Sequence, residues 1–396
     1  MKILILHSRY LSGQTSGENR VVEDEAQLLR DAGHDVHVWA PSPTEFSPLG
    51  LVRIGGRAVW SRAAVNEVRR LVRTLRADVV HCHNLFPMLS PAVLAAAASE
   101  GAAVVVTLHN YRFLCLPSTF LRDGSVCEDC LGHLPWRGVR HRCYRDSLLA
   151  SGALAASLTL HRALRTLDRV HSYLAVSSFL REKYVRAGFP AGHISLKPNF
   201  VNAVRQREGP GDYFLFLGRL SGEKGLATLV EVSRQTPARV VVAGDGPDRD
   251  LFRDAPPSLD YRGNLGGHEL PPLLAGARAL LVPSRWYEGA PRVVLEAYAA
   301  GVPVLASRIG ALPELVEDGE SGLLAAPDDV LAWRAALERL CDDAESERMG
   351  TRAWHLWKDR YSPERGLENL EEAYRSSLAA SGRGPEIATD GGVVSR

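Results

Sequence analysis

Residues 283–325 constrain the fold of this chain more than any other stretch. Pro291 stands where the first residue of a helix is expected, and Gly301 follows the end of an apolar run, so a short helix is predicted over residues 291–300. Residues 302–306 are apolar and predict a buried strand. A helix followed directly by a buried strand is the repeating unit of a doubly wound α/β domain.

Two acidic residues flank the start of this predicted helix. Glu288 falls in the preceding loop, is followed by Gly289, Ala290 and Pro291, and is separated from Glu296 by seven residues. The first turn of a helix leaves backbone N–H groups without partners, which suits an anion, and two nearby carboxylates suit the hydroxyl groups of a sugar. The alternative is an ordinary helix whose glutamates face solvent.

The length and charge of the chain limit the class of protein. Its 396 residues are enough for two domains, and the composition, 45% hydrophobic and 23% charged, is that of a globular protein. Lys plus Arg (47) against Asp plus Glu (46) leave a net charge of +1, which provides no overall field to attract nucleic acid. The N-terminal apolar run predicts a first strand instead of a signal peptide, and residues 148–160 are too few to span a bilayer. We therefore expect a cytoplasmic protein.

The first half of the chain alternates between predicted strands and helices. A strand at residues 2–6, a polar loop containing Gly17 and a helix at 21–32 match the opening of many dinucleotide-binding folds. Gly17 would allow the loop to approach a phosphate or an acceptor; the alternative is a plain turn. His109 follows a predicted strand, and His81 and His83 end another, which places all three at the carboxyl edge where open sheets bind ligands.

The second half restarts after a polar run at residues 205–211, so we place two domains at residues 1–204 and 205–360. A strand at 213–217 leads into a glycine-rich loop that contains Arg219 and Lys224. Such a loop before a helix is a common way to hold a diphosphate, with Arg as a two-pronged donor and Lys as a mobile charge. The alternative is a structural ion pair.

Together these motifs resemble the bacterial retaining glycosyltransferases of family 4, which have the GT-B fold. The resemblance rests on the Glu-seven-Glu pair with its flanking residues and on the Arg and Lys of the glycine-rich loop. It implies two doubly wound Rossmann-like α/β domains that face each other across a cleft. It also implies a C-terminal helix, residues 361–379, that crosses back to the first domain. The tail at 380–396 is rich in Gly, Ser and charge and is expected to be disordered.

The resemblance also implies an activity: transfer of a glycosyl (hexosyl-type) group from a nucleoside diphosphate sugar to a hydroxyl acceptor with retention. Arg219 and Lys224 would hold the diphosphate, Glu288 would contact the sugar hydroxyls, Glu296 the ribose, and His109 would lie beside the reacting centre. The catalytic set is then His109, Arg219, Lys224 and Glu288. The donor-binding residues are Gly17, Gly218, Arg219, Lys224, Gly244, Gly263, Leu265, Glu288, Gly289, Ala290, Pro291 and Glu296.

Several features stay open at this level. The family usually has a Gly-Gly pair in the first loop, whereas this chain has Ser16-Gly17-Glu18. A UDP-sugar is favoured by family frequency alone, and no catalytic metal is expected because side chains supply the positive charge. A sugar-nucleotide epimerase and a non-catalytic nucleotide-sugar-binding partner are the alternatives. The acceptor could be a cell-surface polysaccharide, a lipid-linked sugar or a small natural-product scaffold.

A cysteine-rich insert, residues 112–145, interrupts the first domain. It contains Cys115, Cys127, Cys130 and Cys143, and its lack of periodicity predicts loops. Four thiolates can close a structural zinc site, with His133 or His141 as replacement ligands; free thiols or a redox pair are the alternatives.

The end of the insert, residues 136–145, holds four Arg and two aromatic residues. It could bind an acidic acceptor such as a lipid diphosphate at the inner face of a membrane, and the alternative is a solvated basic loop over the cleft.

Overall fold

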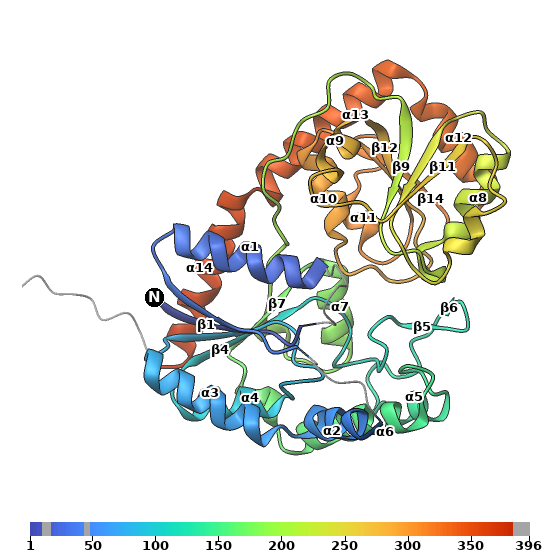
Figure 1. Ribbon diagram of the computed structural model, residues 1–396. Coiled ribbons are helices and arrows are strands. Elements are labelled where there is room, and N and C mark those ends of the chain that lie inside the picture. The colour runs from blue at the N-terminus through green and yellow to red at the C-terminus, as the bar shows by residue number, and fades with distance from the viewer. Residues whose placement is uncertain (10–16, 43–47, 383–396) are drawn as a thin grey trace, which may run out of the picture.

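The computed structural model describes residues 1–9, 17–42 and 48–382, with the side chains of residues 48–53 excepted. The chain forms two α/β domains, each built on a six-stranded sheet in which all strands run parallel (Figure 1). The expected fold class, two Rossmann-like domains, is confirmed.

The first sheet has the strand order β2-β1-β3-β4-β7-β8. Its strands are β1 (Lys2–Leu6), β2 (Asp35–Trp39), β3 (Val79–Cys82), β4 (Ala103–Leu108), β7 (Ser172–Ala175) and β8 (Ile194–Leu196). The second sheet has the order β11-β10-β9-β12-β13-β14. Its strands are β9 (Tyr213–Leu217), β10 (Val240–Ala243), β11 (Leu259–Gly263), β12 (Ala277–Val282), β13 (Val304–Ser307) and β14 (Gly322–Ala325). The expected domain boundary at 204/205 therefore falls between the last strand of one sheet and the first strand of the other.

Helices cover both faces of each sheet. In the first domain they are α1 (Gly17–Asp31), α2 (Pro48–Val59), α3 (Arg62–Leu75), α4 (Ala92–Ser99), α5 (Trp136–Arg140), α6 (Leu148–Ala163) and α7 (Ser178–Arg186). In the second they are α8 (Leu226–Arg234), α9 (Leu270–Ala275), α10 (Arg292–Ala299), α11 (Leu312–Leu315), α12 (Val330–Leu340) and α13 (Asp343–Leu356), followed by α14 (Pro363–Ala380).

The apolar strands explain why helices lie on both faces. Along β4 the side chains of Val104 and Val106 join one buried cluster, and those of Ala103 and Val105 join another. Successive side chains of a strand point to opposite faces, so a strand that is apolar throughout must be covered on both sides.

The chain crosses between the domains twice. It leaves the first domain after β8, and it returns through a π-helical turn (Trp357–Tyr361) into α14, which packs along α1 and against β4 and β7 (Figure 1). The two crossings are bonded to each other at Val201, whose carbonyl accepts from Trp357 Nε1 (3.0 Å) and whose N–H donates to Tyr361 O (3.1 Å). Helix α14 thus belongs structurally to the first domain.

Some predicted boundaries were wrong. The first helix begins at Gly17, four residues before the predicted start, and the helix predicted near the first glutamate begins at Arg292 instead of Pro291. The helical periodicity of residues 57–76 predicts one helix there. The structure has two, because α2 ends at Val59 and Ser61 caps α3 with its side chain. Ala380 is the last residue of α14; the rest of the expected disordered tail lies, from residue 383, outside the described residues.

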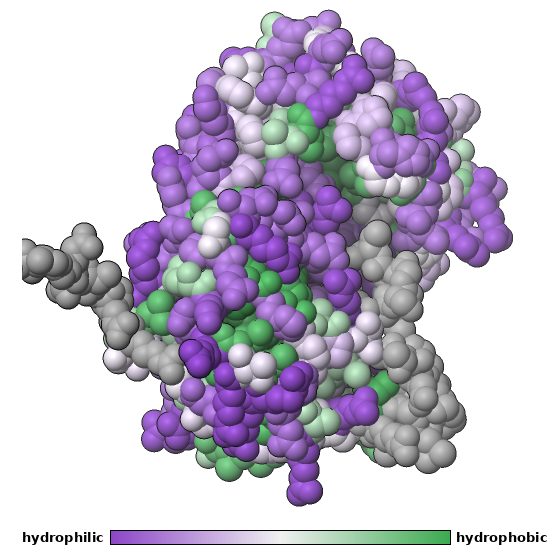
Figure 2. All heavy atoms as spheres, turned by 60° about the vertical axis from the view of Figure 1, so that its left-hand side comes forward, coloured by the Kyte–Doolittle hydropathy of each residue, from purple (hydrophilic) through white to green (hydrophobic). Residues whose placement is uncertain are grey.

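The insert at residues 112–145 has little regular structure. It contains a hairpin of two-residue strands, β5 (Leu121–Arg122) and β6 (Ser125–Val126), and the short α5. The surface in Figure 2 is mostly hydrophilic, with hydrophobic side chains gathered in small areas. Among the described residues, no helix is both long enough and apolar enough to cross a bilayer.

Candidate active site

The strand order of the second sheet reverses between β9 and β12, and the loops after these two strands carry the predicted donor residues. Arg219 and Lys224 follow β9, and Glu288 follows β12. Open α/β sheets bind ligands outside the carboxyl ends of their strands at such a reversal. The sheet topology therefore brings the cationic loop and the acidic loop together.

Glu288 is the centre of a set of polar contacts. Its Oε1 accepts hydrogen bonds from Lys224 Nζ (2.7 Å), Ser284 Oγ (2.6 Å) and Trp286 Nε1 (2.9 Å), and the residue is only 5% exposed. Burial by itself raises the pKa of Glu288, but the charge of Lys224 and these hydrogen bonds outweigh it and hold the pKa below its ordinary value. At neutral pH Glu288 is an ionised carboxylate paired with Lys224.

A glycine brings these two charges together. Gly225, directly after Lys224, has a φ of +72°, and a Cβ there would lie 1.8 Å from the carbonyl oxygen of Pro283. Only glycine lets the loop after β9 lie this close to the end of β12. The Lys224 Nζ also lies 5.2 Å from the centre of the Trp286 ring, a cation–π distance.

The two predicted phosphate-binding cations differ in their surroundings. Arg219 is exposed and forms no hydrogen bond or ion pair with any residue in 1–9, 17–42 or 48–382, whereas Lys224 is held by Glu288. An anion could therefore attract Arg219 without breaking a contact, but it would compete with Glu288 for Lys224.

The neighbouring predicted glycines lie at the carboxyl ends of β9, β10 and β11. Gly218 N donates to Ala243 O (3.1 Å), and Gly244 N donates to Gly263 O (2.8 Å). These bonds hold three loops together beside Arg219. Leu265 is half-buried two residues beyond β11, and its role in lining a nucleotide base stays a prediction.

Glu296 lies on α10 in a chain of charges that crosses between the domains. Its Oε1 accepts from Arg292 Nε (2.9 Å), and Arg292 Nη2 lies 2.5 Å from Asp24 Oδ2 on α1. Pro291 precedes the helix with extended backbone (φ −66°, ψ 119°). The side chain of Glu296 is 31% exposed, so it remains accessible, and its contact with a ribose stays a prediction.

The loop after β12 that carries the predicted donor residue Glu288, called the donor loop below, touches the first domain at Gly289. A Cβ on Gly289 would lie 2.8 Å from the carbonyl oxygen of His109 and 3.4 Å from Leu180 Cδ1. Glycine is needed for this close approach, and it sets the predicted His109 next to the residue that follows Glu288. The structure thus brings His109, Glu288 and Lys224 into one region between the domains, with Ala290 packed against the core of the first domain.

His109 is paired with a second histidine. Its Nε2 lies 2.8 Å from His83 Nδ1, and the two rings stack with centres 5.1 Å apart. Burial, together with the positive charge of Lys197, holds the pKa of His109 well below its ordinary value, and burial does the same to His83. Both rings are therefore neutral at pH 7, and one N–H donates to the other ring.

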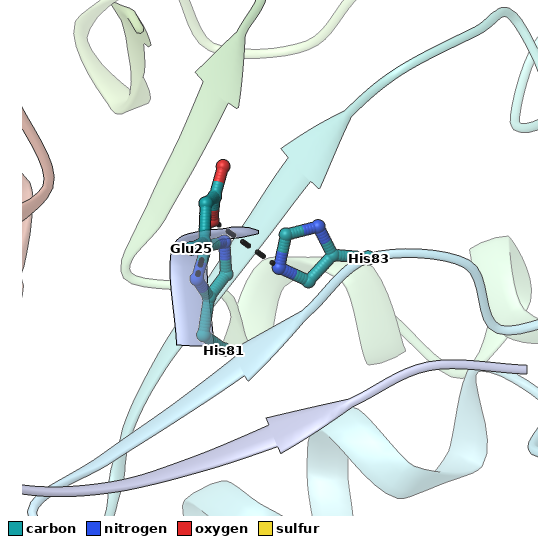
Figure 3. A group of neighbouring side chains, drawn as sticks. All are labelled: Glu25, His81 and His83. Carbon is teal, nitrogen blue, oxygen red and sulfur yellow. Dashed lines mark ion pairs between the residues drawn. The ribbon is translucent and has the colours of Figure 1, made fainter. Parts of the chain in front are cut away.

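A buried polar network lies behind this pair. Glu25 on α1 points toward His81 and His83, with its Oε2 3.9 Å from His81 Nδ1 and 3.5 Å from His83 Nε2 (Figure 3). Its other oxygen bonds Lys197 Nζ. Burial raises the pKa of Glu25, and Lys197 opposes this rise. His81 bonds Tyr374 on α14 through Nδ1 (2.8 Å), so the network attaches the C-terminal helix to the first domain.

This network could suggest a metal site, since Glu25, His81 and His83 form the one group of three or more candidate ligands within 4.8 Å of one another in the part of the chain that is described. Lys197 opposes that reading because its ammonium repels a cation. His81 also has both nitrogens occupied, by Tyr374 and by Thr107 Oγ1 (2.7 Å). His81 is 0% exposed and does not line the hollow at the carboxyl edge of the sheet, whereas His83 does.

A hollow opens at the carboxyl edge of the first sheet. Glu18, His83, His109, Asn110 and Arg112 are among the residues that line it. Asn110 Nδ2 donates to Glu18 Oε1 (2.6 Å), which joins the start of α1 to the end of β4. Gly17 precedes Glu18 and is exposed. Most of the loop before Gly17 lies outside the described residues.

Tyr287, just before Glu288, anchors the donor loop on the first domain. Its ring packs edge-on against Phe179 (centres 4.9 Å apart), and Lys183 Nζ lies 4.9 Å from the ring centre. Burial, reinforced by the nearby Glu128 carboxylate of the insert, raises the pKa of Tyr287 to about 12. The insert thus reaches the residue next to Glu288.

Sequence reasoning missed Glu25, Lys197, Trp286, Tyr287 and the Asp24–Arg292 ion pair. Only Glu25 offered a signal in the sequence, since it is a charged residue inside an amphipathic helix. That signal is weak, because a surface glutamate on such a helix has the same local sequence features. The four insert cysteines, in contrast, line one common cavity, whereas His133 and His141 are exposed and are not among its lining residues.

Two family descriptions match the two domains in turn. "Glycosyltransferase Family 4" matches residues 15–205, and "Glycosyl transferases group 1" matches residues 211–343. Glycogen synthase from Mycobacterium tuberculosis is 36% identical over 404 residues, which covers 89% of each chain. The chain therefore belongs to the group 1, family 4 glycosyltransferases.

Other similarities are partial or concern the fold. A GDP-mannose-dependent alpha-mannosyltransferase of Corynebacterium glutamicum is 32% identical over 174 residues, 43% of this chain and 41% of that protein. Sucrose-phosphate synthase from Thermosynechococcus elongatus shares the fold with a TM-score of 0.71 at 18% identity, covering 96% of this chain and all of that one. HepE of Anabaena, solved in complex with UDP-glucose, has a TM-score of 0.64 at 17% identity, covering 94% of this chain and 99% of that one.

Proposed function

We propose that this glycosyltransferase moves a sugar, hexosyl in type, from a nucleoside diphosphate donor to a hydroxyl acceptor with retention of anomeric configuration. The observation that carries the proposal is the Lys224–Glu288 pair at the strand reversal of the second domain, next to Gly289, which lies against the backbone carbonyl of His109. A cation for phosphate and a carboxylate for hydroxyls then lie side by side, as a sugar diphosphate requires.

The barrier of this reaction lies in the departure of the diphosphate, which gains negative charge as the bond to the anomeric carbon breaks. Arg219 and Lys224 would meet that charge, with the backbone N–H groups of Gly289 and Ala290 at the start of α10. Removing one preorganised donor of this kind typically costs about 2.7–4 kcal/mol in the transition state.

Glu288 would bind the donor sugar. Its three hydrogen bonds all reach Oε1, which leaves Oε2 as the atom to accept from sugar hydroxyls. His109, held neutral by burial, would offer a hydrogen bond without adding a charge beside the developing cationic centre. Retention would follow from attack on the same face that the diphosphate leaves, with a phosphate oxygen taking the acceptor proton.

A UDP-sugar is the first donor to test, because HepE, a structural neighbour, binds UDP-glucose. A GDP-sugar is the second, because a partial relative is GDP-mannose-dependent. The acceptor would lie on the first domain, near the hollow that includes His83 and Asn110. A lipid-linked acceptor would suit the basic end of the insert, where Trp136 is 48% exposed beside Arg137.

The test is a donor panel of UDP-, GDP- and ADP-sugars, each with and without lipid-linked and free sugar acceptors. We expect release of nucleoside diphosphate that depends on acceptor, with a product of unchanged anomeric configuration by NMR. Formation of an isomeric nucleotide sugar without acceptor would indicate an epimerase instead, and tight binding without turnover would indicate a binding partner.

Lys224→Met distinguishes the activity of this protein from that of a contaminating enzyme. The variant should lose activity, whereas a co-purified enzyme would keep its full activity. Lys358→Met, on an exposed lysine of the second crossing, is the matched control and should behave as wild type.

A further inference from the structure

The cysteine-rich insert folds its four cysteines around one small cavity of about 20 Å³. Cys115 comes from the loop after β4, Cys127 and Cys130 from the turn after β6, and Cys143 from the end of α5. The cavity is large enough for one atom-sized occupant. Residues separated by up to 28 positions thus converge on a single point.

Positive charge lies beside the cavity. The guanidinium of Arg122 lines it and lies 2.7 Å from the Asp129 carboxylate. Four thiolates around a divalent cation carry a net charge of −2, so a neighbouring guanidinium group would lower the cost of forming them.

The start of the insert joins the core of the first domain through residues such as Leu116 and Phe120, but the rest of the insert buries little apolar surface. Between residues 121 and 143, only Cys130, Pro135 and Gly138 are buried. Two non-glycine residues of this stretch, Asp123 and Arg142, have left-handed backbone (φ +52° and +51°). A segment that buries so little apolar surface needs a cross-link to hold one conformation.

We propose that Cys115, Cys127, Cys130 and Cys143 bind one zinc ion. Each thiol loses its proton to solvent as its Zn–S bond forms, so four protons leave for each Zn²⁺ bound. Zinc bonds to sulfur are about 2.3 Å long in a tetrahedron. No three of the sulfurs lie within 4.8 Å of one another, so metal binding requires the cysteine side chains to turn toward the cavity that all four line. With four protein ligands the zinc is structural.

The zinc would act on the active site through Glu128, which lies between Cys127 and Cys130. Glu128 Oε1 lies 2.5 Å from Lys183 Nζ, and Lys183 Nζ lies 4.9 Å from the centre of the Tyr287 ring. Tyr287 precedes Glu288, the proposed sugar-binding residue. Zinc would therefore fix the position of Glu128 and, through Lys183, support Tyr287 of the donor loop. The zinc site itself does not depend on the proposed function, but its expected effect on activity rests on that function.

Metal content is the first test. Protein purified under reducing conditions without chelator should contain one zinc per chain by mass spectrometry of the element. Cobalt(II) in its place should give the absorption of a tetrahedral thiolate site. Cys130→Ser should lose the zinc, while Cys341→Ser, at an exposed cysteine outside the insert, should keep it.

The wild-type chain provides a test that needs no variant. Titration with a mercurial should release one zinc with a colour change in a metal indicator, and at least four thiols should react. Absence of zinc after exposure to excess Zn²⁺, or disulfide bonds among these cysteines in the freshly purified protein, would overturn the proposal.

A final comparison isolates the link to the active site. Glu128→Gln should keep the zinc and lower donor affinity, whereas Cys130→Ser should lose both, with activity reduced about 10–100-fold. Zinc bound at full stoichiometry in a protein without transferase activity would support the metal site and count against the proposed function.

Discussion

Two lysine–glutamate pairs in this protein have the same chemistry and different positions. In the first domain Glu25 and Lys197 are both 0% exposed and are surrounded by histidines and Tyr374. In the second domain the side chains of Lys224 and Glu288 are 24% and 6% exposed. The first pair is enclosed on all sides and can serve only the fold, whereas the lysine of the second pair can exchange partners with a ligand. Access to solvent, more than the presence of a charge pair, separates a candidate binding site from a structural contact.

The largest expected effect comes from breaking the enclosed pair. Lys197→Met leaves Glu25 charged and buried without a partner, which typically costs about 3–5 kcal/mol of stability. Urea unfolding followed by circular dichroism measures this loss. The double variant Glu25→Gln with Lys197→Met removes both charges and should recover most of it. A single variant as stable as wild type would mean that the pair is not buried in solution.

The second prediction concerns the accessible pair. Lys224→Ala should lower turnover by about 10²–10³-fold, the cost of one lost transition-state donor. Its loss of stability should be smaller than that of Lys197→Met, because Ser284 and Trp286 still donate to Glu288. Steady-state kinetics and urea unfolding on the same preparations measure the two effects. A large loss of stability with normal turnover per folded molecule would show that the Lys224–Glu288 pair is structural and does not take part in turnover.

The smallest effect is the share of the pH dependence of stability that His83 alone contributes. Burial lowers the pKa of His81, His83 and His109 well below 6.5, so on acidification the unfolded chain takes up protons before the folded one. The free energy of unfolding then falls as pH drops below about 6.5, by up to about 1.4 kcal/mol per pH unit for each histidine, until the folded-state pKa is reached.

Glu25 contributes with the opposite sign. Its pKa is raised, so its contribution is present at low pH and is lost as pH rises through the folded-state pKa. Because the two contributions oppose each other, the test compares two proteins that both contain Glu25. The free energy of unfolding of wild type should fall more than that of His83→Gln between about pH 7 and pH 5. Parallel curves would show that His83 is not held neutral by the fold.

The sequence predicted the parts of the protein that depend on local patterns. Apolar runs at regular spacing predicted the strands, and the loop glycines with Arg219, Lys224 and Glu288 predicted the side of the sheet on which they gather. These predictions succeeded because the carboxyl ends of parallel strands always meet at one edge. The family resemblance supplied the arrangement of two such domains.

The contacts between distant segments could not be predicted in this way. Lys197 finds Glu25 across 172 residues, and Glu314 accepts from the backbone N–H of Ser178 (2.8 Å) in the other domain. Nothing in the neighbouring residues marks these partners, because the tertiary fold alone makes them close. The break between α2 and α3 was missed for a different reason. The apolar pattern of residues 57–76 continues without interruption, although the side chain of Ser61 starts a new helix within it.

The bond between the two interdomain crossings at Val201 has a mechanical consequence. Because the two connections are bonded to each other, they act as one hinge between the domains. Rotation about this hinge has to break the Arg292–Asp24 and Glu314–Ser178 contacts, which also join the two domains. The distance between a fluorophore pair placed on the two domains would follow that rotation.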